Sequence, residues 1–334
     1  MRNLAYIFLS LLILITSCSK GPKEYRLQGL AQGTYFYITY YSNKDQTETI
    51  NSHIDKIFDS IDASVSLWNP NSIVNKINNN QNTYLDEIFI DNLTKAIYLA
   101  EITEGSFDIT IGGLVEAYGF AAKEKAEIND HIIDSLLVYV DYSSIELRED
   151  TLIKKYRNTK LNFNAIAQGY TTDKIAEYLL SIGVDSFIID VGGEVRASGK
   201  KPNNQVWTCA IETPNLDNPS QRIYDHYIEL DNESIVTSGD YRKFYEEDGK
   251  KVSHTIDPKT GRNVEHNLIS VAVTAPTATE ADALATAFMV MGKDKSLAWL
   301  KDYPEYQAYF ILIDQDGSLT TYATPNLEQR LIKN

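Results

Sequence analysis

The stretch that decides the fold is YTTDKIAEYLLSIGVDSFIIDV, residues 170–191. Residues 170–182 place apolar side chains at helical spacing, so this segment predicts an amphipathic helix that is entered from Gly169 and ends at Gly183. Residues 186–191 then form a short apolar run that is typical of a strand. A helix that leads directly into a strand predicts a domain in which both kinds of element share one core.

The same patterns continue on both sides of this stretch. Further helices are expected over residues 47–61, 92–104 and 280–291. Further strands are expected over residues 34–41, 206–211, 227–230, 269–274 and 309–314, and residues 127–160 read as strand-like segments and charged turns. The order lacks a strict alternation of strand and helix, and hairpin-like pairs are frequent. We therefore expect an α+β fold with mixed, largely antiparallel sheets and packed helices.

Composition excludes one class of function. The chain has 334 residues, of which 43% are hydrophobic, so it can bury one large core. The formal net charge of -15 argues against nucleic-acid binding, because no excess of Lys and Arg is available to neutralise phosphates. An acidic chain that handles a phosphorylated ligand usually needs a cation as mediator.

The N-terminus reads as an export signal. Arg2 is followed by a short apolar run over residues 7–15, too short for a membrane-spanning helix, and the run ends before Thr16-Ser17-Cys18. This resembles a lipobox, so we expect a signal peptide over residues 1–17 and a bacterial membrane anchor on Cys18 that faces the periplasm. A lipidated tether over 18–28 and one domain over 29–334 would follow. The alternative is an ordinary secretory signal with an incidental cysteine.

One predicted helix carries a polar pair on an otherwise apolar sequence. Asp282 and Thr286 are four residues apart, so they project from the same face on successive turns. Burying a carboxylate and a hydroxyl is costly without a partner, and Mg²⁺ with oxygen ligands would supply one. The alternative is a capping Asp and a Thr that bonds to a carbonyl of the preceding turn.

Other segments suggest ligand contacts, each with a structural alternative. Trp68 lies in a loop rich in Asn and Pro, where an aromatic ring can stack on a planar ligand or fold back onto the core. Asp108 lies between small residues and can bind a ligand or cap a turn. Polar residues 162–168 precede a helix and can face a phosphate. His254, one of five histidines, precedes a DPKTG turn, and Cys209 reads as a packing residue.

Taken in order, these segments resemble the ApbE family of FAD:protein FMN transferases. The matching motifs span residues 32–292: QGT at 32–34, SLWNPNS at 66–72, FDITIGGL at 107–114, YGF at 118–120, NAIAQGY at 164–170 followed by Asp173, DVGGEV at 190–195, VTSGDY at 236–241, SHTIDPKTG at 253–261 and ADALATA at 281–287. The ordered set is specific to the family.

The resemblance implies the site residues. A metal site falls on the carbonyl of Ala165 and the side chains of Asp282 and Thr286, and catalytic roles fall on His254 and Asp282. The implied FAD contacts are Gln32, Trp68, Ser106, Phe107, Asp108, Asn162, Gln168, His254, Thr255 and Ile256. Gln32 replaces a common Met, Asn162 a usual Asp, and Gln168 a frequent Lys or Glu. The last two departures remove charge from the implied FAD cleft.

The resemblance also implies the reaction. With Mg²⁺ bound, a Thr or Ser hydroxyl of an acceptor flavoprotein would attack the FMN phosphorus of FAD and release AMP. The acceptors would belong to extracytoplasmic electron-transfer systems. Two alternatives stay open: hydrolysis of FAD to FMN and AMP, and a flavin-binding lipoprotein without catalysis.

Overall fold

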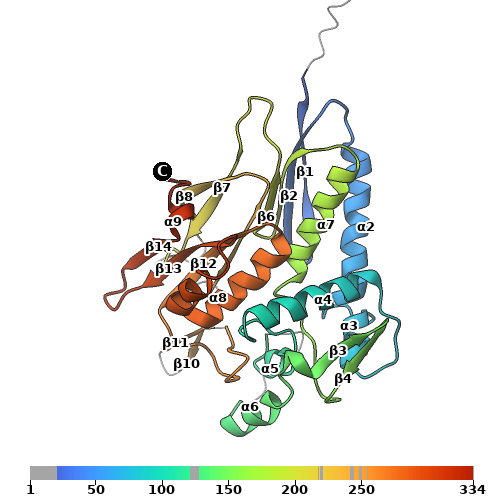
Figure 1. Cartoon of the computed structure of the whole chain (residues 1–334), viewed down its shortest axis with the longest axis vertical. Coiled ribbons are helices and arrows are strands. Elements are labelled where there is room, and N and C mark those ends of the chain that lie inside the picture. The colour runs from blue at the N-terminus through green and yellow to red at the C-terminus, as the bar shows by residue number, and fades with distance from the viewer. Residues whose placement is uncertain are drawn as a thin grey trace, which may run out of the picture.

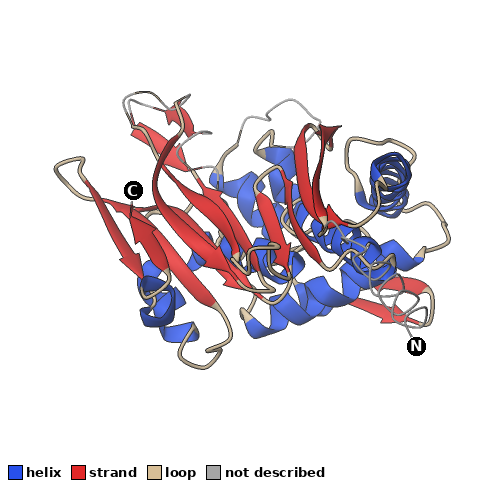
Figure 2. Ribbon diagram, turned by 90° about the horizontal axis from the view of Figure 1, so that it is seen from above, coloured by secondary structure: helices blue, strands red, loops and turns tan. Residues whose placement is uncertain are grey.

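The fold is built on one large antiparallel sheet. The computed structural model describes residues 21–120, 128–216, 218, 221–240, 244–247, 250–253 and 255–333. Within these residues eight strands pair in the order β1-β2-β5-β6-β9-β12-β13-β14, and every neighbouring pair is antiparallel. Seen from above, the strands twist relative to one another across the molecule (Figure 2). Their bounds are β1 (Lys23–Ala31), β2 (Thr34–Ser42), β5 (Ser186–Val191), β6 (Glu194–Ser198), β9 (Ser234–Gly239), β12 (Leu268–Ala275), β13 (Gln307–Ile313) and β14 (Leu319–Ala323).

Helices cover one face of this sheet. α2 (Thr47–Val65) and α7 (Ala167–Ser181) lie side by side next to β1 and β2, and α8 (Ala278–Trp299) lies against β12 (Figure 1). Alternate residues of β5, Phe187, Ile189 and Val191, pack on the α2–α7 side because successive strand residues point to opposite faces. α4 (Glu87–Ile102) packs against both α2 and α8.

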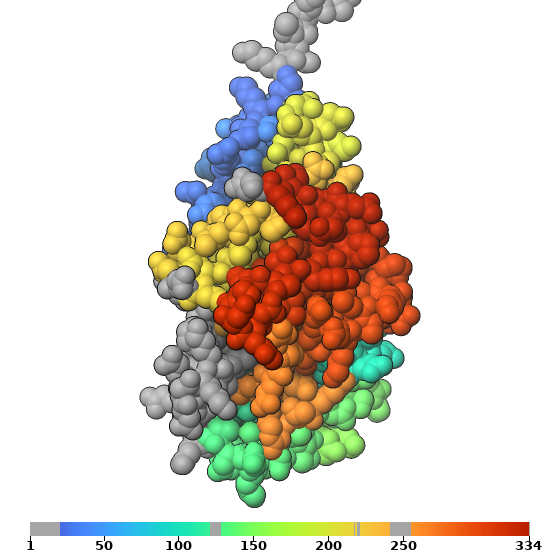
Figure 3. Space-filling model, turned by 90° about the vertical axis from the view of Figure 1, so that its left-hand side faces the viewer, coloured from blue at the N-terminus to red at the C-terminus, as the bar shows by residue number. Residues whose placement is uncertain are grey.

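A smaller sheet covers part of the opposite face. β7 (Trp207–Thr213), β8 (Ile223–Leu230) and β15 (Leu331–Lys333) pair in the order β15-β8-β7, and α9 (Pro325–Glu328) precedes β15. Figure 3 shows the dark red C-terminal residues against the yellow residues of this sheet. Ala272 of β12 packs in the cluster that this sheet covers, whereas Val271 and Val273 pack on the helical side. β12 is therefore mostly apolar, because both of its faces are buried.

Shorter elements form the lower part of Figure 1. They are α3 (Ile73–Asn78), α5 (Gly112–Ala117), α6 (Asp130–Leu137), η2 (Tyr142–Ser144) and the hairpins β3 (Ile145–Arg148) with β4 (Thr151–Lys154) and β10 (Phe244–Glu247) with β11 (Lys250–Ser253). Leu114 of α5 and Ile133 of α6 form a small apolar cluster with Tyr118 and Ile256. This cluster fixes the 255–261 segment against α5.

The structure confirms the predicted α+β class with largely antiparallel sheets, and it corrects two local expectations. The tether expected over residues 18–28 is ordered strand from Lys23 onward, because Leu27 is buried and β1 pairs with β2 along its whole length. Its charged residues belong to an exposed edge, which hides the strand pattern. The segment 127–160 contains the helix α6, with its N-cap at Asn129.

Candidate functional site

The predicted metal residues lie where two helices touch. Gly169, in the first turn of α7, donates from its backbone N–H to Asp282 Oδ2 of α8 at 3.0 Å. A Cβ on Gly169 would stand 2.3 Å from the carbonyl oxygen of Ala278, so only glycine allows this approach. Ala165 lies just before α7, and Thr286 follows Asp282 by one helical turn. The structure thus brings the segments that carry all three residues to one helix junction.

Asp282 is a buried carboxylate with little to compensate its charge. Burial raises the pKa of Asp282 to about 7; the Gly169 hydrogen bond opposes this shift and the negative charge of Asp173 adds to it. A carboxylate in this setting favours either a proton or a cation. The environment therefore suits a cation ligand, because a bound cation restores the ionised form.

Asp173 organises the same junction through the backbone. Its carboxylate accepts hydrogen bonds from the N–H groups of Ala278 and Thr279, both at 2.9 Å, at the start of α8. It also pairs with Arg196 of β6. Anions are favoured at a helix N-terminus, so Asp173 ties α7, α8 and β6 together. The sequence motif contains this residue, but its packing role appears only in the structure.

We expect Asp173→Asn to lower the free energy of unfolding by about 3 kcal/mol, because this change leaves Arg196 without its buried partner. Chemical denaturation would measure the difference. The matched control is Asp134→Asn, whose side chain is 67% exposed beside Arg262 and should change stability little. Equal effects of the two variants would contradict the structural role of Asp173.

Two strand turns surround the N-terminal end of α7. In the β1–β2 turn, Gln32 adopts a left-handed conformation with φ 52°, and its Nε2 donates to Thr171 Oγ1 at 2.8 Å. In the β5–β6 turn, a Cβ on Gly192 would stand 2.8 Å from Nε2 of Gln168. The predicted contacts Gln32 and Gln168 are therefore brought together with the Gly169–Asp282 junction.

The other predicted contacts gather beside α5. Asn162 N–H donates to the carbonyl of Ile109 at 2.7 Å, directly after the 106–108 segment. Thr255 Oγ1 donates to Asp240 Oδ1 at 2.9 Å, and Ile256 is buried against α5 and α6. Ser106 and Phe107 are buried as well. Asn162 thus lies next to the 106–108 segment and Ile256 packs on α5, but contact of these residues with flavin stays a prediction.

The carboxylate of Asp108 is held by hydrogen bonds from neighbouring residues. Its Oδ1 accepts from the N–H of Thr110 at 2.8 Å and from Thr110 Oγ1 at 2.6 Å, and its Oδ2 accepts from the N–H of Tyr142 at 2.9 Å. Burial raises the pKa of Asp108 despite these hydrogen bonds. This pattern matches the turn role that was the alternative for this residue, and it fixes the backbone of 106–108.

Trp68 has an exposed indole and lies in a loop whose backbone is held by hydrogen bonds. The side chain of Trp68 is 65% exposed. Nδ2 of Asn75 donates to the carbonyl oxygens of Leu67 at 3.0 Å and Asn69 at 2.8 Å, which fixes the loop on both sides of the ring. An exposed ring on a fixed loop can stack on a ligand at small entropic cost.

Sequence reasoning missed a third acidic residue at the junction, beside Asp282 and Asp173. Glu194 begins β6 directly after Gly192 and Gly193, and it is buried. Burial raises the pKa of Glu194 well above its usual value, and the negative charge of Asp282 raises it further. A charged residue that follows Gly-Gly at the start of an apolar strand was the available signal.

The remaining predictions concern two residues that the structure does not describe, one cysteine and the kind of metal site. His254 and Cys18 lie outside the described ranges. Burial raises the pKa of the Cys209 thiol to about 12, as befits a packing residue. Between residues 21 and 333, with the gaps given above, no three His, Cys, Asp or Glu side chains gather as a metal cluster. The predicted metal site uses one carboxylate, one hydroxyl and one carbonyl, so it needs no such cluster.

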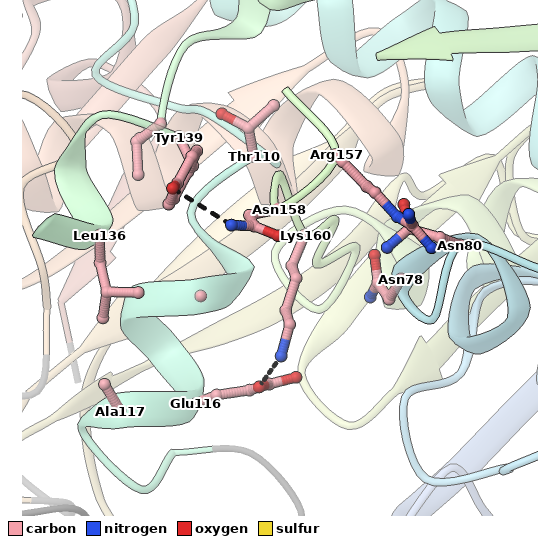
Figure 4. A pocket seen from close by; sticks show the side chains of 12 residues that line it. Asn78, Asn80, Thr110, Glu116, Ala117, Leu136, Tyr139, Arg157, Asn158 and Lys160 are labelled. Atoms are coloured by element: carbon pink, nitrogen blue, oxygen red, sulfur yellow. Dashed lines mark hydrogen bonds and ion pairs between the residues drawn. The ribbon is translucent and has the colours of Figure 1, made fainter. Parts of the chain in front are cut away.

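A cavity of about 450 Å³ lies beside α5, and none of the predicted contact residues lines it. Figure 4 shows Lys160 pointing to Glu116 and the Asn158 amide pointing to Tyr139 across it. Thr110, which holds Asp108, contributes to its wall. The buried charge lies at the α7–α8 junction instead, so we place the candidate site there.

The fold matches solved structures of enzymes. It is similar to "Flavin Transferase ApbE from Vibrio cholerae", with a TM-score of 0.82 and 26% identity over 92% of this chain and 99% of that chain. It is also similar to the apo form of the Pseudomonas stutzeri flavinyl transferase ApbE, with a TM-score of 0.82 and 27% identity over 93% and 97% of the two chains. The fold is therefore that of this structural class of transferases.

Sequence comparison gives the family. The ApbE family model matches residues 32–310. The FAD:protein FMN transferase of Vibrio cholerae is 31% identical, with all of both chains covered, and that of Haemophilus influenzae is 31% identical, with 94% of each covered. The chain belongs to the ApbE family.

Proposed function

We propose that this protein is a FAD:protein FMN transferase that requires Mg²⁺. The observation that carries the proposal is the buried Asp282 carboxylate at the α7–α8 junction, within a fold shared with flavin transferases. FAD is the substrate and an extracytoplasmic flavoprotein is the acceptor. Membership of the family supports the reaction, whereas the metal and the hydroxyl acceptor are our inference.

The donor set at the junction fits a hard cation. Asp282 offers a carboxylate oxygen, Thr286 a hydroxyl and Ala165 a backbone carbonyl, and Mg²⁺ prefers such oxygen ligands. The nearby Glu194 is a further acidic group, and Arg196 on the same strand is already paired with Asp173. The junction is therefore short of positive charge. A bound Mg²⁺ would offset the charge of the pyrophosphate and of the departing AMP.

The chain's own residues prepare the site for transfer. Gly169 N–H holds the Asp282 carboxylate in one orientation, and Asp173 holds the start of α8 in place. In the proposed step, a Thr or Ser hydroxyl of the acceptor forms a bond to the FMN phosphorus, the bond from that phosphorus to the AMP oxygen breaks, and the hydroxyl loses its proton. His254 is our candidate to receive that proton or to orient the phosphate.

One incubation separates the three possible activities. The soluble domain is mixed with FAD, Mg²⁺ and an acceptor flavoprotein domain, and the products are resolved on a denaturing gel. Flavin fluorescence on the acceptor band together with AMP release supports transfer. FMN and AMP without labelled protein identify an FAD pyrophosphatase, and intact FAD identifies a binding protein. Either of the last two results would overturn the transferase assignment.

Trp68→Ala should weaken FAD binding without affecting the fold. Loss of an aromatic stack costs about 0.5–1.5 kcal/mol, so we expect the Kd for FAD to rise about two- to twelve-fold. Flavin fluorescence titration measures this. Tyr84→Ala is the matched control, because Tyr84 is likewise exposed, at 75%, and has no predicted flavin contact. An unchanged Kd in Trp68→Ala would remove Trp68 from the site.

We also propose that the protein is anchored to the periplasmic face of a bacterial membrane through Cys18. The apolar run of residues 7–15 and the small residues before Cys18 support this. Cys18→Ala should move the protein from the membrane fraction to the soluble fraction and abolish incorporation of labelled palmitate. Palmitate incorporation that persists in this variant would refute the anchor.

A further inference from the structure

The proposed reaction leaves one buried carboxylate at the junction without a role. Glu194 is only 9% exposed, and its Oε2 is buried without a hydrogen-bond partner in the described part of the chain. Buried polar atoms are nearly always satisfied, because leaving one unpaired costs about 1–3 kcal/mol. An orphaned carboxylate oxygen therefore indicates that a polar group occupies this position in the working protein.

Glu194 is held by the same helix that orients Asp282. Thr172 Oγ1 lies 3.3 Å from the carbonyl oxygen of Glu194 and 3.0 Å from that of Gln168. Gly169, three residues before Thr172 on α7, donates to Asp282. The first turns of α7 thus fix the backbone at Glu194 and the carboxylate of Asp282 together.

Charges around Glu194 do not compensate it. Asp282 and Asp190 both add negative potential at this carboxyl group. Arg196 is the cation of β6, and it is paired with Asp173. A proton or a cation that enters the junction would compensate the charge of this carboxyl group.

We propose that Glu194 is a positioning residue for the cation, accepting hydrogen bonds from water molecules bound to the Mg²⁺ that Asp282 holds. The inference rests on the proposed function. Mg²⁺ usually keeps several of its waters in proteins, and these waters donate to nearby oxygens. Groups that hold a metal's ligands in this way typically change its affinity by about 10–100-fold.

Calorimetric titration of Mg²⁺ without flavin tests the role directly. We expect Glu194→Gln to raise the Kd for Mg²⁺ at least about ten-fold and Glu194→Asp to have an intermediate effect. Glu212→Gln is the matched control, because Glu212 is also mostly buried, with 15% of its side chain exposed, but lies on β7 in the other sheet. Without Mg²⁺, Glu194→Gln should unfold at about the same temperature, because burial already favours the uncharged form of Glu194 and glutamine keeps the size of the side chain.

The outcomes separate this inference from the proposed function. If Asp282→Asn weakens Mg²⁺ binding but Glu194→Gln changes the Kd by less than about two-fold, only the role of Glu194 fails. If neither variant changes Mg²⁺ binding, the metal site itself is wrong. A Glu194→Gln protein that unfolds at a clearly lower temperature would show that Glu194 is a structural hydrogen-bonding residue, which also overturns the inference.

Discussion

Asp282→Asn is expected to lower Mg²⁺-dependent turnover at least about a hundred-fold while the protein stays folded. The amide oxygen can still accept the hydrogen bond from Gly169 N–H, so the helix junction keeps its geometry. What is lost is the negative charge that a cation needs. Removing a buried carboxylate whose pKa is raised should not destabilise the fold. Steady-state rates across a range of Mg²⁺ concentrations, together with thermal unfolding, measure both effects.

Comparison with Asp282→Ala separates charge from orientation. Alanine removes both the charge and the acceptor for Gly169, so it should be at least as inactive as the asparagine variant and less stable. A variant that stays fully active at low Mg²⁺ would show that the metal assignment is wrong. An Asp282→Asn variant that is as active as the native protein would also show that the metal assignment is wrong, because the two side chains differ mainly in charge.

The elements that were predictable from sequence are those with a strong local pattern. β5 matches the predicted strand 186–191, and α7 begins three residues before the predicted start at 170. The helix predicted to end at residue 291 continues in α8, but it is kinked at the next residue, because Gly292 adopts a non-helical φ of 74°. β1 and α6 were missed because both are amphipathic and largely exposed, which leaves too few buried residues to set a period.

The candidate site likewise contains residues that the sequence predicts and residues that only the folded structure reveals. The Asp282/Thr286 pair was visible because helical spacing is a local property of the sequence. Glu194 acquires its character only when β6 folds against the start of α7 and near Asp282, which no sequence window contains. Asp173 likewise gains its role from Arg196 and from the start of α8, far along the chain. Burial and charge coupling are properties of the packed molecule.

Gly169→Ala should cost more stability than any other glycine-to-alanine change near the site. The new Cβ would stand 2.3 Å from the Ala278 carbonyl oxygen and 2.8 Å from Cβ of Asp282. Neither neighbour is the flexible end of a side chain, so α7 and α8 must separate. Overpacking of this kind costs about 1–3 kcal/mol or more. The separation also breaks the hydrogen bond to Asp282, so we expect activity to fall together with the free energy of unfolding.

Gly113→Ala is the matched control, because it adds the same methyl group to a helix without a close contact. Gly113 lies in α5, where a Cβ would meet only Cδ2 of Leu136 at 3.8 Å, an ordinary contact. Alanine is favoured over glycine inside a helix by about 1 kcal/mol, so Gly113→Ala should be neutral or stabilising. Gly169 also lies in a helix, and helix propensity alone predicts the same gain there. A stabilised Gly169→Ala would therefore mean that α7 and α8 do not touch at this residue, and the site built on their contact would fail with it.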